Sequence, residues 1–234
     1  KCADGSPTGM GVNLSPGSDT LIIYTPSGGA CWDGLTCYVL NLASNIDGYG
    51  DAKLQNGLLS PPGIYAPIFF ARDDMENPLR EANYVFLPYC TGDLLSGRQV
   101  VEIEDLFGNA RETHFVGHLN MQRYVARLAA AFPNVERVWL IGTSGGGFGV
   151  LFNWPLVREA FPDVRLDIMT DASAAVPAGA ELWEACSDAW SPFTAPDCEG
   201  CEAGLPQLQD YLLETLEAPS RFATVTHDED GIIA

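Results

Sequence analysis

Short apolar runs alternate with longer amphipathic segments along this chain of 234 residues. Five runs rich in strand-forming residues predict buried strands, at Thr20–Tyr24, Tyr84–Tyr89, Val138–Ile141, Leu166–Thr170 and Phe222–Thr226. Helical spacing and flanking breakers predict helices over Tyr38–Ser44, Phe115–Phe132, Phe148–Phe161 and Leu208–Leu216. Strands that alternate with helices predict an α/β fold, with a mostly parallel sheet and helices on both faces. We expect a single domain over residues 1–234.

In two segments the apolar residues recur with neither a helical nor a strand period. Residues 47–82 carry many Gly and Pro and are expected to cross the top of the sheet, while residues 172–204 are predicted to be irregular. Apolar residues within 58–70 and 176–195 are candidates for an acyl pocket or a lid, and core packing explains them equally well. In open parallel sheets ligands bind beyond the carboxyl ends of the strands.

The most informative stretch joins the third predicted strand to the helix after it. Here Ser144 stands in the pattern Gly-x-Ser-x-Gly, between Gly142 and Gly146. Such a serine sits on a sharp turn with its hydroxyl exposed, and the two small residues let strand and helix pack closely. The stretch therefore predicts Ser144 as a nucleophile; the alternative is a glycine-rich turn that merely contains a serine. The spacing fits neither a dinucleotide fingerprint nor a phosphate-binding loop.

A serine esterase also needs backbone donors for the oxyanion that forms during acyl transfer. One is the N–H of Gly145, directly after the nucleophile. A second set is expected from the loop after the first strand, where Gly28 and Gly29 let the backbone approach a ligand closely. The alternative for this loop is an ordinary tight turn.

The acid and the base are less clearly marked. Asp230 fits the acid best, because it follows the last predicted strand; Asp228 lies closer to that strand, and Asp171 ends the strand before it. Hydrolases with this turn have the order Ser, acid, His, yet only four residues follow Asp230. Either the chain ends before the last strand, its helix and the histidine, which we favour, or Ser144 works with Asp171 and His227.

Two further histidines precede the serine. His114 and His118 are four residues apart on or near a helix expected to open at Thr113, so they are predicted to share one face. No third ligand lies near them, which favours capping and core roles over a zinc site.

Composition narrows the classes of partner and compartment. The 31 acidic and 12 basic residues give a net charge of −19, which disfavours nucleic acid and anionic membrane surfaces. No apolar stretch approaches the length of a membrane span. Seven cysteines favour disulfides in an extracellular or periplasmic protein, with one thiol left over. Their pairing stays open, and only Cys198-x-x-Cys201 has zinc-like spacing.

Five stretches together resemble one known family. They are Cys2–Pro7, Ser27–Trp32, Asn83–Gly97, Gly142–Gly147 and Thr170–Ser173, similar to the patterns C-x-D-G-S-P, E-G-G-x-x-C, N-x-V-x-x-P-Y-C-x-x-D-x-x-S-G, G-x-S-A-G-G and D-A/S-G. The family is the pectin acetylesterase/Notum family of serine carboxylesterases, with the α/β-hydrolase fold. Pro26-Ser27 stands where the family has Glu-Gly, and Gly145 where it often has Ala; neither change removes a backbone donor.

The resemblance implies Ser144 as nucleophile and Gly28, Gly29 and Gly145 as oxyanion donors. It further implies an acid at the turn from Asp228 to Asp230, a histidine beyond residue 234, and a small disulfide loop between Cys31 and Cys37.

The function expected is that of a secreted serine carboxylesterase. Through a Ser144 acyl-enzyme, it would remove acetyl or other short acyl groups from a small molecule, polysaccharide or protein, with no cofactor and no metal. A catalytically silent α/β-hydrolase-fold binding protein is the alternative. A redox role for Cys198 and Cys201 is disfavoured, because the acidic residues around them raise thiol pKa values.

Overall fold

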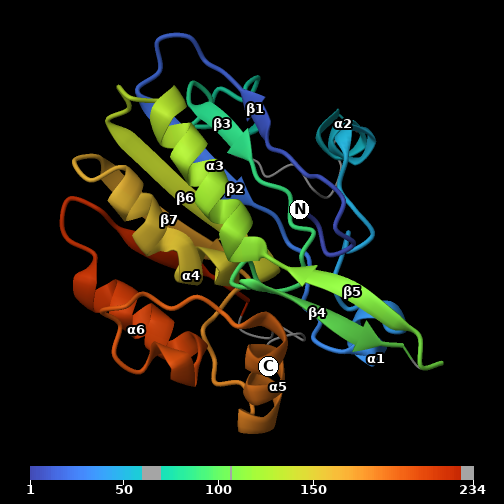
Figure 1. Ribbon diagram of the computed structural model, residues 1–234. Helices are drawn as coiled ribbons and strands as arrows, with labels where there is room; N and C mark the ends of the chain where they lie inside the picture. Colours follow the sequence, from blue (N-terminus) through green and yellow to red (C-terminus); the bar gives the residue numbers. More distant parts are fainter. Residues whose placement is uncertain (60–69, 106, 228–234) are drawn as a thin grey trace.

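The computed structural model describes residues 1–59, 70–105 and 107–227. A six-stranded sheet in the order β1-β3-β2-β6-β7-β8 forms its centre (Figure 1). Its strands are β1 Gly11–Asn13, β2 Thr20–Thr25, β3 Asn83–Phe86, β6 Arg137–Thr143, β7 Arg165–Asp171 and β8 Phe222–Val225. Only the β1–β3 pair is antiparallel. All five predicted strands are therefore confirmed, and β1 was not predicted because its three mostly exposed residues have no apolar pattern.

Each face of the sheet packs against a different part of the chain. Helices α3 (Gly117–Ala131) and α4 (Gly145–Ala160) lie across one face, and α6 (Leu205–Thr215) packs beside α4 (Figure 1). The main core lies between these helices and the inward side chains of alternate strand residues, among them Leu21, Ile23, Val138, Leu140, Leu166 and Ile168. On the opposite face, Ile22 and Tyr84 pack with Tyr49 and with Leu54 of α2 (Asp51–Leu59). The prediction of helices on both faces is thus confirmed.

Several elements differ from the prediction, among them α2, a helix within residues 47–82, where the sequence predicted none. The first helix, α1, spans Gly34–Tyr38 instead of residues 38–44, because Asp33 and Thr36 form a capping box that starts it earlier. Helix α5 (Ala180–Trp190) lies in the segment predicted to be irregular; Cys186 and Trp190 are buried and Trp183 and Ala189 also pack against the core, so the prediction overlooked an apolar helix face. A separate hairpin, β4 Gln99–Glu104 with β5 Ala110–Phe115, extends from the body (Figure 1).

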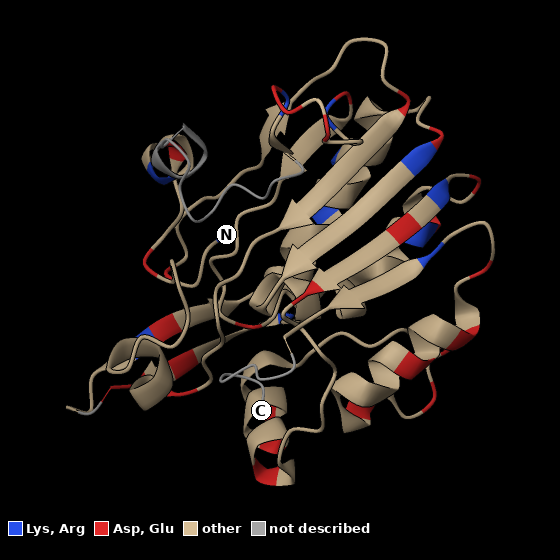
Figure 2. Ribbon diagram, turned by 180° about the vertical axis from the view of Figure 1, so that it is seen from behind, with Lys and Arg blue, Asp and Glu red and all other residues tan. Residues whose placement is uncertain are grey.

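The surface is acidic over several elements. In Figure 2 the positions of Asp and Glu, coloured red on the ribbon, recur along α5, α6 and the β4–β5 hairpin, in keeping with the net charge of −19. Like charges spread over these elements repel polyanions. Among the residues that the structure describes, no helix is long and apolar enough to cross a membrane.

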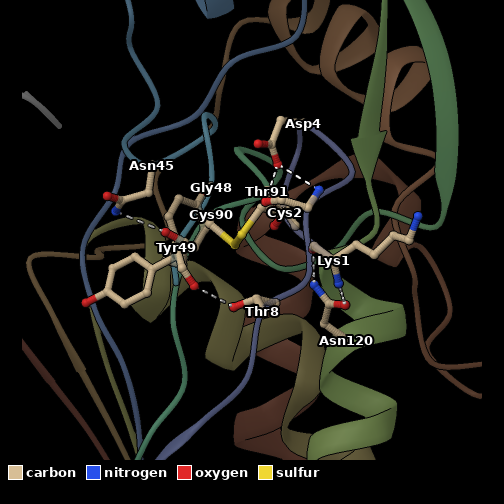
Figure 3. Close-up of a disulfide and its surroundings, with 12 residues drawn as sticks. Lys1, Cys2, Asp4, Thr8, Asn45, Gly48, Tyr49, Cys90, Thr91 and Asn120 are labelled. Atoms are coloured by element: carbon tan, nitrogen blue, oxygen red, sulfur yellow. Dashed lines mark hydrogen bonds between the residues drawn. A yellow bond between two sulfur atoms is a disulfide. The ribbon is translucent and has the colours of Figure 1, made fainter. Parts of the chain in front are cut away.

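Three disulfides hold loops around the sheet. They join Cys2 to Cys90, Cys31 to Cys37 and Cys198 to Cys201, and they leave Cys186 as a buried free thiol. The expected Cys31–Cys37 loop is confirmed. Figure 3 shows the Cys2–Cys90 bond beside the reciprocal hydrogen bonds between the Lys1 backbone and the Asn120 side chain. The N-terminal segment is therefore fixed both to the residues after β3 and to α3.

The Cys2–Cys90 bond is expected to contribute most to stability. It joins residues 88 apart in sequence, whereas Cys31–Cys37 spans only six. In the chain-entropy model a longer closed loop restricts the unfolded state more. Replacing both Cys2 and Cys90 with alanine should lower the free energy of unfolding by about 2–4 kcal/mol, measured by urea denaturation without reductant. The Cys31/Cys37 double alanine variant is the control, and an equal or larger loss in that control contradicts the prediction.

Candidate active site

Ser144 occupies the strained turn that the sequence predicted. Strand β6 ends at Thr143, and Ser144 is the N-cap of α4 with φ 51° and ψ −123°. A non-glycine residue held in such a sparsely populated conformation costs about 1–3 kcal/mol and persists only where its surroundings fix it. Two backbone bonds do so: the Ser144 N–H donates to the Asp171 carbonyl at 2.7 Å, and the Ser144 carbonyl accepts from the Phe148 N–H at 3.0 Å. Its role as nucleophile stays a prediction.

The glycines around Ser144 are required by close backbone contacts. A Cβ at Gly142 would lie 2.4 Å from the Gly146 carbonyl oxygen, and one at Gly146 would lie 2.3 Å from the Thr25 carbonyl oxygen. Real Cβ atoms do not approach backbone so closely. The two glycines of the pattern Gly-x-Ser-x-Gly therefore let strand β6 and helix α4 pack closely, as the sequence predicted. Gly146 also lets α4 approach strand β2.

The loop after β2 lies against the start of α4. A Cβ at Gly145 would be 2.8 Å from the oxygen and 3.2 Å from the nitrogen of Gly29, so the two predicted donors are neighbours. The Tyr89 hydroxyl donates to the Gly29 carbonyl at 2.6 Å, and the Ser44 N–H donates to the Gly28 carbonyl at 2.7 Å.

These bonds hold the loop from behind through its carbonyls. Within the described residues neither the Gly29 N–H nor the Gly145 N–H donates a hydrogen bond. Gly29 is exposed, while Gly28 is buried against the Tyr89 ring. The geometry thus brings together Gly29 and Gly145, with Gly28 one residue behind them; their oxyanion role stays a prediction.

Of the three candidates for the catalytic acid, the structure describes only Asp171. Asp230 and Asp228 lie outside the described residues. Asp171 ends β7, in register with Thr143 of β6 and Val225 of β8. It also raises the pKa of the Tyr24 hydroxyl, after the larger effect of burial.

His227, the alternative base, is exposed and lies two residues beyond β8. Neighbouring strands are about 4.8 Å apart, so β8 runs roughly 10 Å from β6. Within the described residues no side-chain hydrogen bond joins Ser144, Asp171 and His227.

The two earlier histidines do not share a helix face, so that prediction was wrong. His114 lies in β5 opposite Val100, and its Nε2 is 2.9 Å from Glu112. Only His118 belongs to α3, where it is buried, as expected for a core histidine. Residues 111–114 are four consecutive polar residues, so no alternation of polar and apolar residues marked β5 as a strand. In the described part of the chain no group of three or more His, Cys, Asp or Glu is arranged to hold a metal ion.

The tautomer of His118 follows from its neighbour. The Asn153 amide nitrogen donates to the carbonyls of Leu95 and Gly149, so its Oδ1 faces His118 Nδ1 at 2.8 Å as an acceptor. Nδ1 therefore carries the proton. Phe193 stacks on the ring at 4.0 Å between centroids. Burial lowers the pKa of His118, the Asn153 hydrogen bond partly opposes this, and Arg98 lowers it further.

Stability should therefore depend on pH through His118. Because its pKa is lower in the folded than in the unfolded protein, the unfolded chain binds the extra proton first as pH falls below about 6.5. The free energy of unfolding then rises with pH through this window, by at most about 1.4 kcal/mol per pH unit for one group. His118→Gln should reduce the slope between pH 5 and 7, measured by urea denaturation at several pH values. An unchanged slope contradicts this.

Comparison with known proteins decides the family. The pectinacetylesterase family matches residues 1–179 of this chain. The chain belongs to this family. The family resemblance inferred from the five sequence stretches is thus confirmed. The relatives found in this family are named as carboxylesterases.

Relatives of this pectinacetylesterase-family chain include palmitoleoyl-protein carboxylesterase NOTUM of Mus musculus, 28% identical over 182 residues. Another is notum1' of Xenopus laevis, 31% identical over 179 residues. Each alignment covers 73% of this chain but only 33% or 34% of the relative, so the chain spans about a third of their length. The solved structure of the Wnt deacylase Notum from Drosophila matches with a TM-score of 0.64 and 19% identity, over 94% of this chain and 67% of that one. The chain thus has the α/β-hydrolase fold.

Proposed function

We propose that this chain provides the nucleophile region of a carboxylic ester hydrolase that works through an acyl-enzyme on Ser144. The observation that supports this best is the strained Ser144 backbone beside the N–H groups of Gly29 and Gly145, which lie next to each other and donate no hydrogen bond within the described part of the chain. A strained, half-buried serine such as Ser144, with donors at the oxyanion position, is an arrangement suited to acyl transfer.

The proposed reaction has two steps. Ser144 Oγ attacks the ester carbonyl, its proton passes to a histidine base, and the N–H groups of Gly29 and Gly145 stabilise the negative charge on the carbonyl oxygen. The alcohol leaves with the proton, and water then releases the acid from Ser144 by the same route. We propose Asp230 as the acid that orients the base, with Asp228 and Asp171 as the other candidates. Within the described residues no histidine is hydrogen-bonded to Ser144.

The proposed substrate is a neutral acyl ester carried by a small molecule, a polysaccharide or a protein. The relatives are named as palmitoleoyl-protein carboxylesterases, and the solved relative as a Wnt deacylase. The net charge of −19 disfavours polyanionic substrates and nucleic acid. Three disulfides support a place of action outside the cytosol, because thiols stay reduced inside it.

A serine-reactive alkyl phosphonate tests the proposal. In the folded full-length protein we expect one phosphonate adduct per chain, located on Ser144 by peptide mass mapping, together with turnover of p-nitrophenyl acetate. Folded protein that takes up no phosphonate and hydrolyses no ester would instead favour a catalytically silent fold used for binding. Labelling of a different serine overturns the assignment of Ser144.

A further inference from the structure

Ser173 is a buried serine that makes two hydrogen bonds at the proposed nucleophile. It lies two residues after the end of β7, and none of its surface is exposed. Its single hydroxyl proton is shared between two acceptors, the Ser144 carbonyl oxygen at 2.9 Å and the Asp171 carbonyl oxygen at 2.8 Å. The same Asp171 oxygen accepts the Ser144 N–H at 2.7 Å. Both ends of residue 144 are therefore tied to the segment after β7.

The Ser144 carbonyl belongs to the same peptide unit as the Gly145 N–H. A trans peptide is planar, and its C=O and N–H point in opposite directions. Whatever fixes the direction of the Ser144 carbonyl therefore also fixes the direction of the Gly145 N–H. This N–H is the donor that the proposed function assigns to the oxyanion, and the Ser173 hydroxyl lies on the other side of its peptide.

The fold keeps space for this hydroxyl. A Cβ at Gly147 would lie 2.0 Å from Ser173 Oγ, so only glycine at position 147 lets the hydroxyl reach the Ser144 carbonyl. On the β2 side, the buried Thr25 hydroxyl donates to the Gly146 carbonyl at 2.9 Å. The turn is thus held by hydroxyls from both neighbouring strands, and the one from Ser173 acts on the peptide that carries the donor.

We propose that Ser173 is a positioning residue for catalysis: its hydroxyl sets the orientation of the Ser144–Gly145 peptide, and so aims the Gly145 N–H at the developing oxyanion. This inference rests on the proposed esterase function. Ser173 itself touches no reacting atom. Its effect is on the transition state, where the oxyanion needs its donors in place, and hardly on binding of the ground-state ester.

The test compares Ser173→Ala with wild type and with Ser220→Ala in the full-length protein. Ser220 is a matched control, because its hydroxyl also bonds backbone next to β7, accepting from the Leu166 N–H at 3.1 Å, but at the opposite end of that strand. For Ser173→Ala we expect kcat on p-nitrophenyl acetate to fall about 10- to 100-fold with KM nearly unchanged; outright loss of an oxyanion donor costs roughly 100- to 1,000-fold. The rate of phosphonate labelling of Ser144 should fall by a similar factor.

A purely structural role predicts a different result. Both variants would then lower the melting temperature, and kcat and the labelling rate measured well below it would stay within about twofold of wild type. That outcome overturns the inference, as does a change confined to KM. If Ser173→Ala yields too little folded protein, Ser173→Cys keeps the side-chain volume and replaces the hydroxyl with a much weaker donor. A wild-type protein that is neither labelled at Ser144 nor active contradicts the proposed function instead, so the two failures are distinguishable.

Discussion

Replacing Ser144 with alanine should lower kcat for ester hydrolysis by about four to six orders of magnitude, because the proposed acyl-enzyme forms on the Ser144 hydroxyl. The fold should survive the change. Alanine keeps the Ser144 backbone bonds to Asp171 and Phe148, and the structure shows no side-chain cap bond from Ser144 to α4 that would be lost. The measurement is the initial rate of p-nitrophenyl acetate hydrolysis, with melting temperature as the check on folding.

The control for this loss is Ser220→Ala, which changes the same residue type at the opposite end of β7. It should keep wild-type kcat within about twofold, since among the described residues its hydroxyl bonds the Leu166 backbone and the Arg158 side chain, both away from Ser144. If Ser144→Ala retains more than a tenth of the activity, Ser144 is not the nucleophile. In that case the silent binding protein becomes the better account of the fold.

Gly146→Ala should cost more than about 4 kcal/mol of unfolding free energy, or prevent folding altogether. The new Cβ would stand 2.3 Å from the Thr25 oxygen and 2.4 Å from the Pro26 oxygen. Both are backbone atoms at the end of a central strand, paired with β3 on one side and β6 on the other, so neither can move aside cheaply. Urea denaturation of the purified variant measures the loss.

Gly9→Ala is the matched control for that substitution. A Cβ there meets nothing within 4 Å, and Gly9 does not adopt a positive φ. Such a change should be neutral, or stabilise by up to about 1 kcal/mol through the unfolded state. If the two alanine variants unfold at the same urea concentration, helix α4 does not approach strand β2 at Gly146 as closely as these distances indicate.

Sequence reasoning succeeded where the signal is local. The apolar runs at Leu21–Tyr24 and Val138–Ile141 predicted central strands, because residues buried on both faces leave continuous apolar sequence. It failed at α1 and α5. In α1 the capping pair Asp33 and Thr36 outweighed the apolar residues that follow, and α5 lies within a segment whose Pro and Gly residues favoured an irregular structure.

The site shows the same division. Gly142 to Gly146 could be identified as a nucleophile turn, because the spacing of small residues there is a local requirement of a strand that turns into a helix. Tyr89, which holds the Gly29 carbonyl, carried no such signal. A buried tyrosine in an apolar run looks like core, and its partner is 60 residues away in sequence.

The sequence by itself determined the α/β class, the positions of the five main strands along the chain, the turn at Ser144 and, through its combined motifs, the family. These features depend on the periodicity of apolar residues and on contacts between residues close in sequence, and both are present in the sequence before the chain folds. Only the tertiary structure decided which cysteine pairs with Cys2, that Gly29 meets Gly145, and that Ser173 holds the peptide behind the Gly145 N–H. Each of these joins residues from separate elements, so it exists only after the sheet has closed and brought its strand ends together.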